Sequence, residues 1–570
     1  MWRSIIVAFR AFAFTLIIIT LCGIMPGYAG ASRGCMKAWT TYEAESGSTN
    51  GTILTWDGNR GTAASESSSR SCVKLSSPGQ YVTVTTHCIA SNTILVRYSI
   101  PKGTSGTVGL YVNGVKLMDL SLTSRFIYKN NGFHNNPDGS DGSVCDYFDE
   151  VRYVLTRPIP AGATVTLQKD AKSTLSFYLI DLVDLEWAPA ALTQPKNSIS
   201  IADHGGVPGG EIDNYGALAS SIAAAQSQNK VLWIPPGVWN IGRRVNVTSK
   251  ITIRGAGMWY SKLNFTTQHD SGFWLAGVPN CRFYDFSMEG QEIDRGDGSK
   301  PAFGGACTSG GVLQNIWIDH FVNGFWMGLG NKTYDNGFRI IGCRIRNTVA
   351  DGVNCCGGTF GTLIRNCDVR GSGDDAFAVW PADDHGVGQA SHDNTIENCT
   401  AECVWNANGF ALYGGYNNKI ISCSASDIAT YNGINISTVF PGFGFSGANT
   451  VDGVTLIRCG GLCYDDNQQY GGIWFVTSLA PISGVTIRNI DIIDPIHAGI
   501  KIQNDLSGST GNTFTNIAIT GAGGYGVWIL GSGSGKAIFA HVVNTKSASL
   551  GLCDEDKQFT ISRETSNSGW

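Results

Sequence analysis

The C-terminal two thirds of the chain carries an irregular internal repeat, and this repeat limits the folds available to it. Short segments that begin with Gly, Asn or Asp return at intervals of mostly 24 to 39 residues, and each leads into an apolar run. A second β-type run precedes each segment. The first four segments are DGVNCC, DDAFAV, NGFALY and NGINIS, beginning at residues 351, 374, 408 and 432. A repeat of this length that holds several short strands is typical of a solenoid coil, so we predict a right-handed parallel β-helix over residues 199–570.

The region before the repeat has a different pattern. Residues 35–190 alternate apolar and polar residues over short runs such as YVTVTT and TVGLYV, and Asn113-Gly114 between two such runs indicates a hairpin. These features predict an antiparallel β-sandwich, joined to the β-helix by the Ala- and Pro-containing linker WAPAALTQPKNS. One amphipathic helix is expected behind a cap at Asp213 or Asn214. The predicted fold class is therefore all-β.

Charge is scarce along the chain. Asp, Glu, Lys and Arg make up 15% of the 570 residues, against about 25% in an average soluble protein. The formal net charge is −5, and there is no Lys/Arg block suited to a nucleic acid. We therefore expect a neutral polysaccharide as the partner, and a monomer.

The N-terminus has the features of a secretory signal peptide. Arg3 and Arg10 precede the apolar run AFAFTLIIITLC and the small residues of PGYAGAS, so we expect cleavage after Ala29. The alternative, a membrane anchor, is disfavoured because the run is shorter than the roughly 20 residues needed to span a bilayer. The mature protein is predicted to be secreted and not membrane-bound.

Cysteines recur within the repeats. We expect a buried thiol ladder. Three close pairs are disulfide candidates, Cys399/Cys403, Cys459/Cys463 and Cys355/Cys356. No nearby His completes a zinc site. The residues expected to stack in five successive coils are Cys343, Cys367, Cys399, Cys423 and Cys459.

Three carboxylates stand out because charged residues are so scarce in this chain. Asp351 precedes Asp375 by one repeat of 24 residues, which makes the two neighbours on adjacent coils, and Asp374 adjoins Asp375. Like charges this close raise one another's proton affinity. The plainer interpretation is that they are turn residues or calcium ligands on a solvated face, but three in register favour a site that needs both a protonated and an ionised carboxyl.

Glycoside hydrolysis has this requirement, because an acid must protonate the leaving oxygen while a base activates water. In an inverting enzyme the two lie roughly 6.5 to 9.5 Å apart. Aromatic rings in the same or the next two repeats would dock sugars, and Trp405 and Tyr416 stand in open, Gly/Asn-rich surroundings. The predicted substrate-binding residues are Trp380, Trp405, Tyr413 and Tyr416. His385 and His392 are expected to be solvated loop residues.

Residues 199 to about 440 resemble the catalytic β-helix of glycoside hydrolase family 87, the α-1,3-glucanases and mycodextranases. The stretches that carry the resemblance include IRGAGMWYSKL, NIWIDHFVNGFW, RIIGCRIRNTVADGVN, RGSGDDAFAVW and NGFALYGGYNNKI. It implies inverting hydrolysis of α-1,3-glucosidic bonds by three aspartates, which fall on Asp351, Asp374 and Asp375, with no catalytic cofactor. From the stacking we assign Asp374 as the acid and the other two as the pair that activates water.

The sandwich resembles carbohydrate-binding modules that open with a YEAE-like strand, here YEAES at 42–46, and close with an IDxVxLE-like strand, here LIDLVDLEW. In such modules carboxylates at the two ends share a structural calcium ion. The resemblance implies Glu43, Glu45 and Asp181 as ligands, all of them oxygen donors of the kind that Ca²⁺ prefers.

Other functions remain open from the sequence. A polygalacturonase-like hydrolase would need cationic groups for acidic sugars, and no Gly-His-Gly or Arg-Ile-Lys motif of that sort occurs. A polysaccharide lyase would need Arg or Lys as its base. A non-catalytic carbohydrate-binding surface protein could use the same scaffold.

Overall fold

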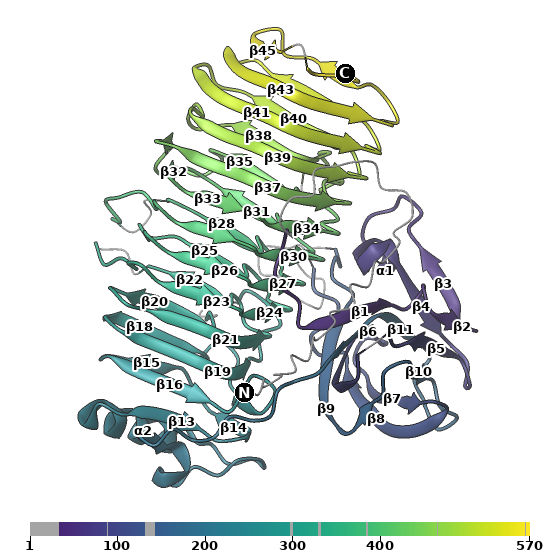
Figure 1. Cartoon of the computed structure of the whole chain (residues 1–570), viewed down its shortest axis with the longest axis vertical. Helices are drawn as coiled ribbons and strands as arrows, with labels where there is room; N and C mark the ends of the chain where they lie inside the picture. Colours follow the sequence, from purple (N-terminus) through teal and green to yellow (C-terminus); the bar gives the residue numbers. More distant parts are fainter. Residues whose placement is uncertain are drawn as a thin grey trace, which may run out of the picture. The chain divides into compact units, whose positions relative to one another are not determined.

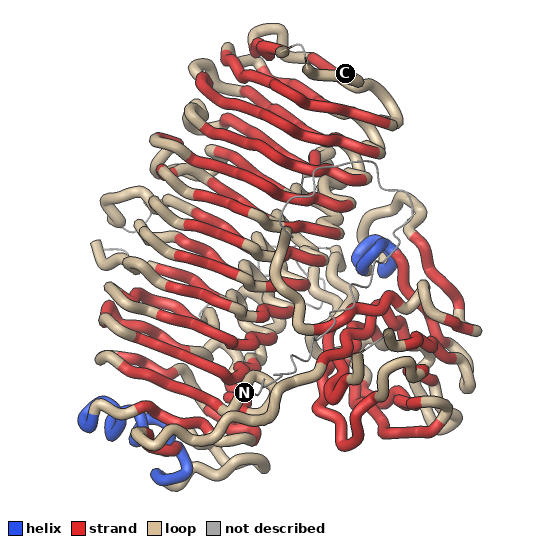
Figure 2. The backbone as a smooth tube through the Cα atoms, in the orientation of Figure 1, coloured by secondary structure: helices blue, strands red, loops and turns tan. Residues whose placement is uncertain are grey.

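The computed structural model describes residues 33–87, 89–130, 143–296, 300–328, 332–382, 386–463, 466–564 and 566–570. The chain from Arg33 to Trp570 forms one compact unit. Strands make up nearly all of its regular structure, as predicted, and helix is confined to short stretches (Figure 2). The predicted signal peptide, residues 1–29, lies outside the described residues. Within the described part, no helix has the length and apolar character needed to cross a membrane.

The N-terminal region is an antiparallel sandwich of two sheets (Figure 1). The first sheet has the order β3-β4-β11-β6-β9 with β1 also paired to β11, and the second has the order β2-β5-β10-β7-β8. The strands of the first are β1 (Trp39–Glu43), β3 (Thr52–Thr55), β4 (Ser71–Leu75), β6 (Ser91–Ser99), β9 (Asp149–Ile159) and β11 (Tyr178–Glu186). Those of the second are β2 (Ser48–Thr49), β5 (Tyr81–Thr85), β7 (Ser105–Val112), β8 (Val115–Thr123) and β10 (Thr164–Gln168). Helix α1 (Ala63–Glu66) and the 3-10 turn Ser68–Arg70 follow β3.

The Asn113-Gly114 prediction is confirmed. β7 and β8 pair with Val112 opposite Val115, and both loop residues have positive φ, 50° and 76°. A two-residue turn with this geometry matches the right-handed twist of its strands, which is why Asn-Gly is favoured there. The two sheets bury an aliphatic core between them, centred on residues such as Val96, Leu110 and Ile180.

The C-terminal region is a parallel β-helix built on two long sheets (Figure 1). The 12-stranded sheet supplies one strand per coil, namely β15 (Val245–Val247), β18 (Phe273–Val278), β20 (Phe303–Cys307), β22 (Phe325–Met327), β25 (Val353–Cys355), β28 (Phe377–Val379), β31 (Phe410–Leu412), β35 (Ile434–Ser437), β38 (Gly471–Thr477), β40 (Ala498–Asn504), β42 (Val527–Gly531) and β44 (Leu552–Asp554).

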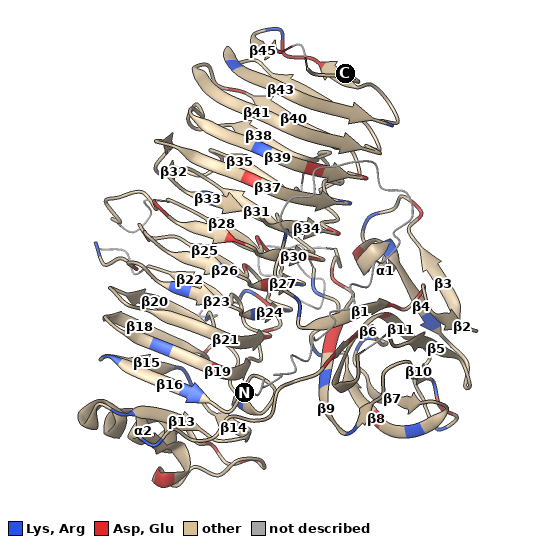
Figure 3. Cartoon of the chain, in the orientation of Figure 1, with Lys and Arg blue, Asp and Glu red and all other residues tan. Residues whose placement is uncertain are grey.

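The 20-stranded sheet completes the coils. Its strands are β12 (Ser198–Ser200), β13 (Val231–Ile234), β14 (Gly237–Ile241), β16 (Ile251–Gly255), β17 (Ser261–Phe265), β19 (Cys281–Glu289), β21 (Val312–Asp319), β23 (Arg339–Ile341), β24 (Arg344–Arg346), β26 (Leu363–Arg365), β27 (Asp368–Arg370), β29 (Thr395–Glu397), β30 (Thr400–Glu402), β33 (Lys419–Ile421), β34 (Ser424–Ser426), β37 (Asn449–Ile457), β39 (Val485–Ile493), β41 (Ser509–Thr520), β43 (Gly535–Thr545) and β45 (Phe559–Arg563). A separate pair, β32 (Gly415–Tyr416) and β36 (Phe445–Ser446), joins two loops. The strands carry few charged residues (Figure 3).

The predicted helix is α2 (Tyr215–Gln228), which precedes β13. Asn214 is its N-cap, and the Asp213 carboxylate accepts a hydrogen bond from the Tyr215 amide at 2.9 Å. A 3-10 turn, Ile201–His204, begins the region.

Several coils turn a corner after the 20-stranded sheet at a residue in the left-handed region. The corner residues that follow β21, β24 and β27 are His320, Asn347 and Gly371, with φ of 58°, 50° and 73°. Asn and Gly adopt this conformation at low cost, so they are suited to a sharp bend between strands. The chain then runs through a short turn to the next strand of the 12-stranded sheet.

The cysteine ladder is confirmed for four of the five residues. Strand registers place Cys343, Cys367, Cys399 and Cys423 in line, all buried. The fifth prediction is wrong, because the next coil places Val454 above Cys423 while Cys459 lies beyond the following corner. β37 pairs with β33 and β34 at the same offset of 31 residues, so the strand spacing is unchanged and Cys459 falls five residues after the ladder position. The three candidate disulfides do not form in this structure, because Cys355, Cys356, Cys399, Cys403 and Cys459 are free thiols.

Candidate active site

The three predicted aspartates lie in the turns that lead into β25 and β28. Parallel pairing of Val353 with Phe377 puts Asp351 directly beside Asp375 on neighbouring coils. The same position is filled by a polar residue in five successive coils. In order along the solenoid these are Asn323, Asp351, Asp375, Asn408 and Asn432. The site is therefore an Asn ladder in which the second and third of the five positions are carboxylates.

The trio converges on one point. One side-chain oxygen from each of Asp351, Asp374 and Asp375 lies within 4.8 Å of the other two. Asp351 is 4% exposed and Asp375 2% exposed, whereas the Asp374 side chain is 33% exposed. These nearest oxygens are closer together than the roughly 6.5–9.5 Å that separates the acid and base of an inverting glycosidase. Inversion is thus supported by the family resemblance and not by this spacing.

Hydrogen bonds along the ladder orient the two buried carboxylates. Asn323 donates to Asp351 at 2.9 Å. Asp375 accepts from both the backbone amide and the side chain of Asn408, at 3.0 and 2.8 Å, and from the Tyr413 hydroxyl at 2.7 Å. Because each acceptor oxygen has a donor in a fixed place, both side chains are held in one orientation.

Arg295, which sequence reasoning missed, contacts the third carboxylate. Its guanidinium lies 2.9 Å from Asp374 and also donates to the carbonyls of Gly373, at 2.7 Å, and Val349, at 3.2 Å. It thereby ties together the turns of two adjacent coils. Arg295 sits in a loop more than fifty residues before the trio in the chain, so no local pattern in the sequence linked it to Asp374.

The electrostatics of the trio favour a retained proton. Burial raises the pKa of Asp351 well above its usual range, and the charges of Asp374 and Asp375 raise it further. Burial, then Asp374, raises the pKa of Asp375 to about 7, although hydrogen bonds from Tyr413 and Asn408 act in the opposite direction. Like charges this close cannot all ionise together, so the group behaves as a coupled set that shares a proton near neutral pH.

Three carboxylate oxygens at this spacing are also an arrangement that could hold a metal ion. The Arg295 guanidinium already supplies a positive charge beside Asp374. Fixed donors likewise occupy an oxygen of each of the other two carboxylates. Some of the carboxylate oxygens that a metal ion would need therefore already contact protein groups.

Two of the predicted sugar-docking rings serve other purposes. Trp405 is 1% exposed, so it offers no ring face to a sugar and that prediction is wrong. A Cβ added to Gly373 would lie 2.0 Å from the Trp405 ring, which shows that the small residue makes room for a buried indole. Tyr413 is also buried and acts as the hydrogen-bond donor to Asp375.

The third predicted ring, Trp380, directly follows the end of β28. Trp380 is partly buried and packs edge-on against Trp326 and Phe440, with ring centroids 5.7 and 5.8 Å apart. Phe440 is 45% exposed and also packs on Tyr413, at 4.9 Å. Tyr413, the hydrogen-bond partner of Asp375, thus contacts an exposed aromatic ring. The sequence did not predict Phe440, because its loop shows no repeat pattern.

Tyr416 lies elsewhere on the coil. Its ring stacks on His392 at 4.4 Å, and His392 stacks on Phe360 at 4.9 Å. His392 is thus half-buried in an aromatic stack, which corrects the expectation of a solvated loop residue. His385 lies outside the described residues.

The predicted calcium ligands Glu43, Glu45 and Asp181 lie close together in the sandwich. Paired strands β1 and β11 carry Glu43 and Asp181, and Glu43 and Glu45 each keep one buried carboxylate oxygen without a partner. Burial raises the pKa of Glu43 to about 8 and that of Glu45 to about 7. Asp181, however, is engaged by the Arg97 guanidinium and the Ser68 amide. Glu43 and Glu45 therefore fit a cation site, whereas the charge of Asp181 is already balanced by Arg97.

Comparisons with known proteins point in one direction. Residues 217–570 match the family described as "Alpha-1,3-glucanase catalytic domain D2", and residues 37–188 match the family described as "Alpha-1,3-glucanase catalytic domain D1". The sandwich and the β-helix thus each match a part of one catalytic unit. No match was found among curated proteins.

Solved structures agree with the family match. The catalytic domain of Agl-KA superposes with a TM-score of 0.87 at 27% identity, covering 95% of this chain and all of that one. A family 87 α-1,3-glucanase in complex with nigerose gives 0.84 at 28%, covering 94% and 100%. The catalytic unit of the thermostable enzyme from Streptomyces thermodiastaticus strain HF3-3 gives 0.82 at 30%, covering 94% and 97%.

Variants of one relative were solved with sugars bound. Each replaces a single aspartate by alanine, and the complexes contain nigerose or tetrasaccharides. Two of these aspartates are adjacent, and the third precedes the first of them by 23 residues. Asp351 stands at the same interval before the adjacent pair Asp374 and Asp375.

Proposed function

The chain belongs to glycoside hydrolase family 87, the α-1,3-glucanases, and we propose that it hydrolyses α-1,3-glucosidic bonds of an α-glucan at the Asp351, Asp374 and Asp375 trio. The observation that carries this proposal is the meeting of the three carboxylates within 4.8 Å on adjacent coils. The interval shared with the aspartates replaced in a sugar-bound relative supports the same residues.

The chemistry follows from one shared proton. A protonated carboxyl gives its proton to the glycosidic oxygen as the C–O bond breaks, and an ionised carboxylate takes a proton from the water that attacks C1. The trio holds both forms at one pH because its members repel one another. We propose a single displacement with inversion, on the strength of the family resemblance.

Asp374 remains our proposed acid, since it is the most exposed of the three and best placed to meet a leaving group in solution. Its carboxylate forms an ion pair with the Arg295 guanidinium, while burial and the neighbouring carboxylates raise the pKa of Asp351. The proposal therefore requires the shared proton to reach Asp374 when substrate binds. A substrate with a good leaving group would restore the rate of Asp374→Asn, but not that of a variant lacking the base.

The proposed sugar contacts are Trp380 and the exposed ring of Phe440. Aromatic rings of this kind present flat apolar faces. Tyr416 remains a proposed contact further around the coil. Secretion through the N-terminal signal, a monomeric state and a calcium ion held by Glu43 and Glu45 are proposed as well.

The decisive experiment incubates purified protein with insoluble α-1,3-glucan and with nigeran, and follows reducing ends and the anomeric form of the first product. We expect soluble products from the wild type, initially of inverted configuration, and none from Asp351→Asn. Retained activity in that variant would overturn the assignment. An initial product of retained configuration would overturn inversion alone.

The rival functions give different results in the same assay. Release of products from polygalacturonate would favour the pectinase-like reading, and an unsaturated product would favour a lyase. Binding to insoluble glucan without any soluble product would favour a non-catalytic sugar-binding protein.

A further inference from the structure

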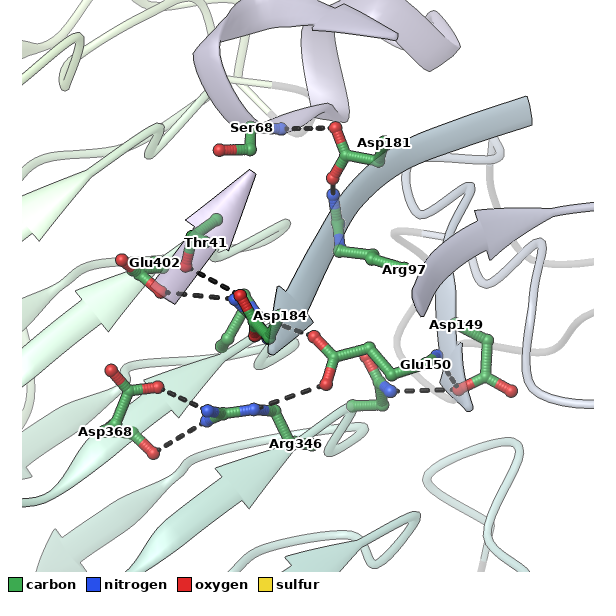
Figure 4. Close-up of polar contacts among 12 residues, drawn as sticks. Thr41, Ser68, Arg97, Asp149, Glu150, Asp181, Asp184, Arg346, Asp368 and Glu402 are labelled. Atoms are coloured by element: carbon green, nitrogen blue, oxygen red, sulfur yellow. Dashed lines mark hydrogen bonds and ion pairs between the residues drawn. The ribbon is translucent and has the colours of Figure 1, made fainter. Parts of the chain in front are cut away.

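Two acidic residues of the sandwich contact the β-helix directly behind the active-site turns. Asp149 and Glu150 begin strand β9. On the solenoid side, Arg346 and Arg370 end β24 and β27, and the turns that carry the trio begin at the next residue. Figure 4 shows Asp149 and Glu150 pointing toward these strand ends.

Glu150 links the two coils of the active site. One of its oxygens pairs with the Arg370 guanidinium and the other lies 3.3 Å from that of Arg346 (Figure 4). Both arginine side chains are 1% exposed, and Glu150 is 3% exposed. A single sandwich carboxylate therefore contacts both the last residue of the strand that leads to Asp351 and the last residue of the strand that leads to Asp374 and Asp375.

Asp149 contacts the corner residues of two successive coils. Its carboxylate accepts a hydrogen bond from the Asn347 side chain at 2.9 Å and contacts the His320 ring at 2.8 Å. Both partners are left-handed corner residues of successive coils. The Asn347 amide also lies against the next corner, since a Cβ added to Gly371 would come within 2.7 Å of its oxygen.

The turns between these corners and the trio are short and internally bonded. Asp351 comes four residues after Asn347, and Asp374 comes three after Gly371. The Gly373 amide donates to the carbonyls of Thr348 and Ala350, at 3.1 and 3.2 Å, so the two turns are joined to each other. A shift at the corners is thus carried to the carboxylates and is not absorbed by a flexible loop.

We propose that Asp149 and Glu150 of the sandwich are positioning residues for the catalytic trio, so that the sandwich completes the active site instead of serving as a separate sugar-binding module. This inference rests on the proposed function. Its physical basis is that catalytic groups must be held within a fraction of an ångström, and that a misplacement of about 1 Å from a distant change can cost on the order of 100-fold in rate.

The test compares two isosteric changes at the same interface. Glu150→Gln removes the charge that joins Arg346 and Arg370. Glu186→Gln is the matched control, because Glu186 makes a bidentate ion pair with Arg344 at 2.6 and 2.9 Å and is similarly buried, but Arg344 begins β24 and does not border the turn. We expect Glu150→Gln to lower kcat about tenfold with KM little changed, and Glu186→Gln to keep the wild-type kcat.

A second variant keeps the proposal testable if Glu150→Gln folds poorly. Asn347→Gly removes the bond to Asp149 while preserving the left-handed corner, since glycine already occupies the equivalent position at Gly371. We expect its kcat to fall several-fold, on the order of the loss in Glu150→Gln, with KM and the glucan-binding affinity unchanged.

The outcomes separate this inference from the proposed function. If the wild type releases no sugar from α-1,3-glucan, the proposed function fails. If the wild type is active and folded Asn347→Gly keeps its kcat, or if Glu150→Gln loses no more kcat than Glu186→Gln, the positioning role is overturned. Loss of glucan binding with kcat intact would instead identify the sandwich as a binding module and would also overturn it.

Discussion

The two turns that contain Asp351 and the Asp374–Asp375 pair have a cluster of charged residues at each end, and the two clusters differ in character. At the corner end, Glu150 and Asp184 pair with Arg346 and Arg370 in a buried network. Asp149 beside them contacts Asn347 and His320, so each charge has a partner. At the other end, Asp374 pairs with the Arg295 guanidinium, and among the described residues the other two carboxylates of the trio have no ion-pair partner.

Burial alone does not distinguish the two clusters, because both contain side chains that are almost fully enclosed. The clusters differ in whether each charge is balanced by an opposite charge. Opposite charges and directed hydrogen bonds make the first cluster a fixed support, whereas the second retains the mutual repulsion that shifts proton affinity. This contrast predicts opposite consequences for removing a charge from either end.

The largest effect is expected from Asp351→Asn. The same ladder position already holds Asn in neighbouring coils, at Asn323, Asn408 and Asn432, so the substitution fits the geometry. We expect kcat to fall by at least about 1,000-fold, since acid–base catalysis contributes on that order.

The melting temperature of Asp351→Asn should not fall, because a repelling buried carboxylate is removed. Thermal unfolding alongside the glucanase assay measures both quantities. A marked loss of stability together with activity would mean that Asp351 is a structural residue.

At the corner end, Arg370→Met should have the opposite result. It leaves Asp184 buried without its arginine and Glu150 with Arg346 alone, and breaking a buried pair on one side costs roughly 3–5 kcal/mol of unfolding free energy. Denaturant unfolding would show the loss. An unchanged midpoint would indicate that water reaches this network and that the two clusters differ less than proposed.

Tyr413→Phe tests the electrostatics of the trio without removing a carboxylate. The phenol donates to ionised Asp375 and so lowers its pKa, which is nevertheless raised to about 7. Its loss should move the limb of the pH–rate profile near 7 upward by about one pH unit, the equivalent of one hydrogen bond to a charged group.

The sign of that shift follows from the hydrogen bond. Without the donor, the protonated form of Asp375 is favoured, and a higher pH is needed to ionise it. A limb that stays in place, or moves downward, would show that Asp375 does not set the profile.

The smallest effect is expected from Glu397→Gln. Its ion pair with Arg365 lies in the same coils but on the solvent face, with side chains 30% and 49% exposed. Screened surface pairs contribute at most about 1 kcal/mol, so stability and kcat should both stay near the wild-type values. A loss as large as that of Arg370→Met would remove the distinction between buried support and surface pair.

Much of this arrangement could be predicted from the sequence because it is periodic. The repeat gave the solenoid, and the interval of 24 residues placed Asp351 beside Asp375. The alternating runs and Asn113-Gly114 predicted the sandwich and its hairpin in the same way. In each case a local pattern is enforced by strand geometry.

The errors arose where packing depends on residues distant in the chain. Trp405 was assigned to an open loop because its neighbours are small and polar, yet Gly373 of the preceding coil receives its ring. Arg295, Asp149 and Glu150 reach the active-site turns from remote segments. Cys459 falls five residues after the ladder position of its coil, which Val454 occupies.

The central claim is that the trio retains a proton near neutral pH. Infrared difference spectra between the wild type and Asp351→Asn, recorded from pH 5 to 9, report this directly through the carbonyl stretch of a protonated carboxyl. The account predicts that this band is present in the wild type at pH 6, is lost from Asp351→Asn, and fades in the wild type only above neutral pH. A wild-type spectrum that shows only carboxylate bands at pH 6 would contradict it.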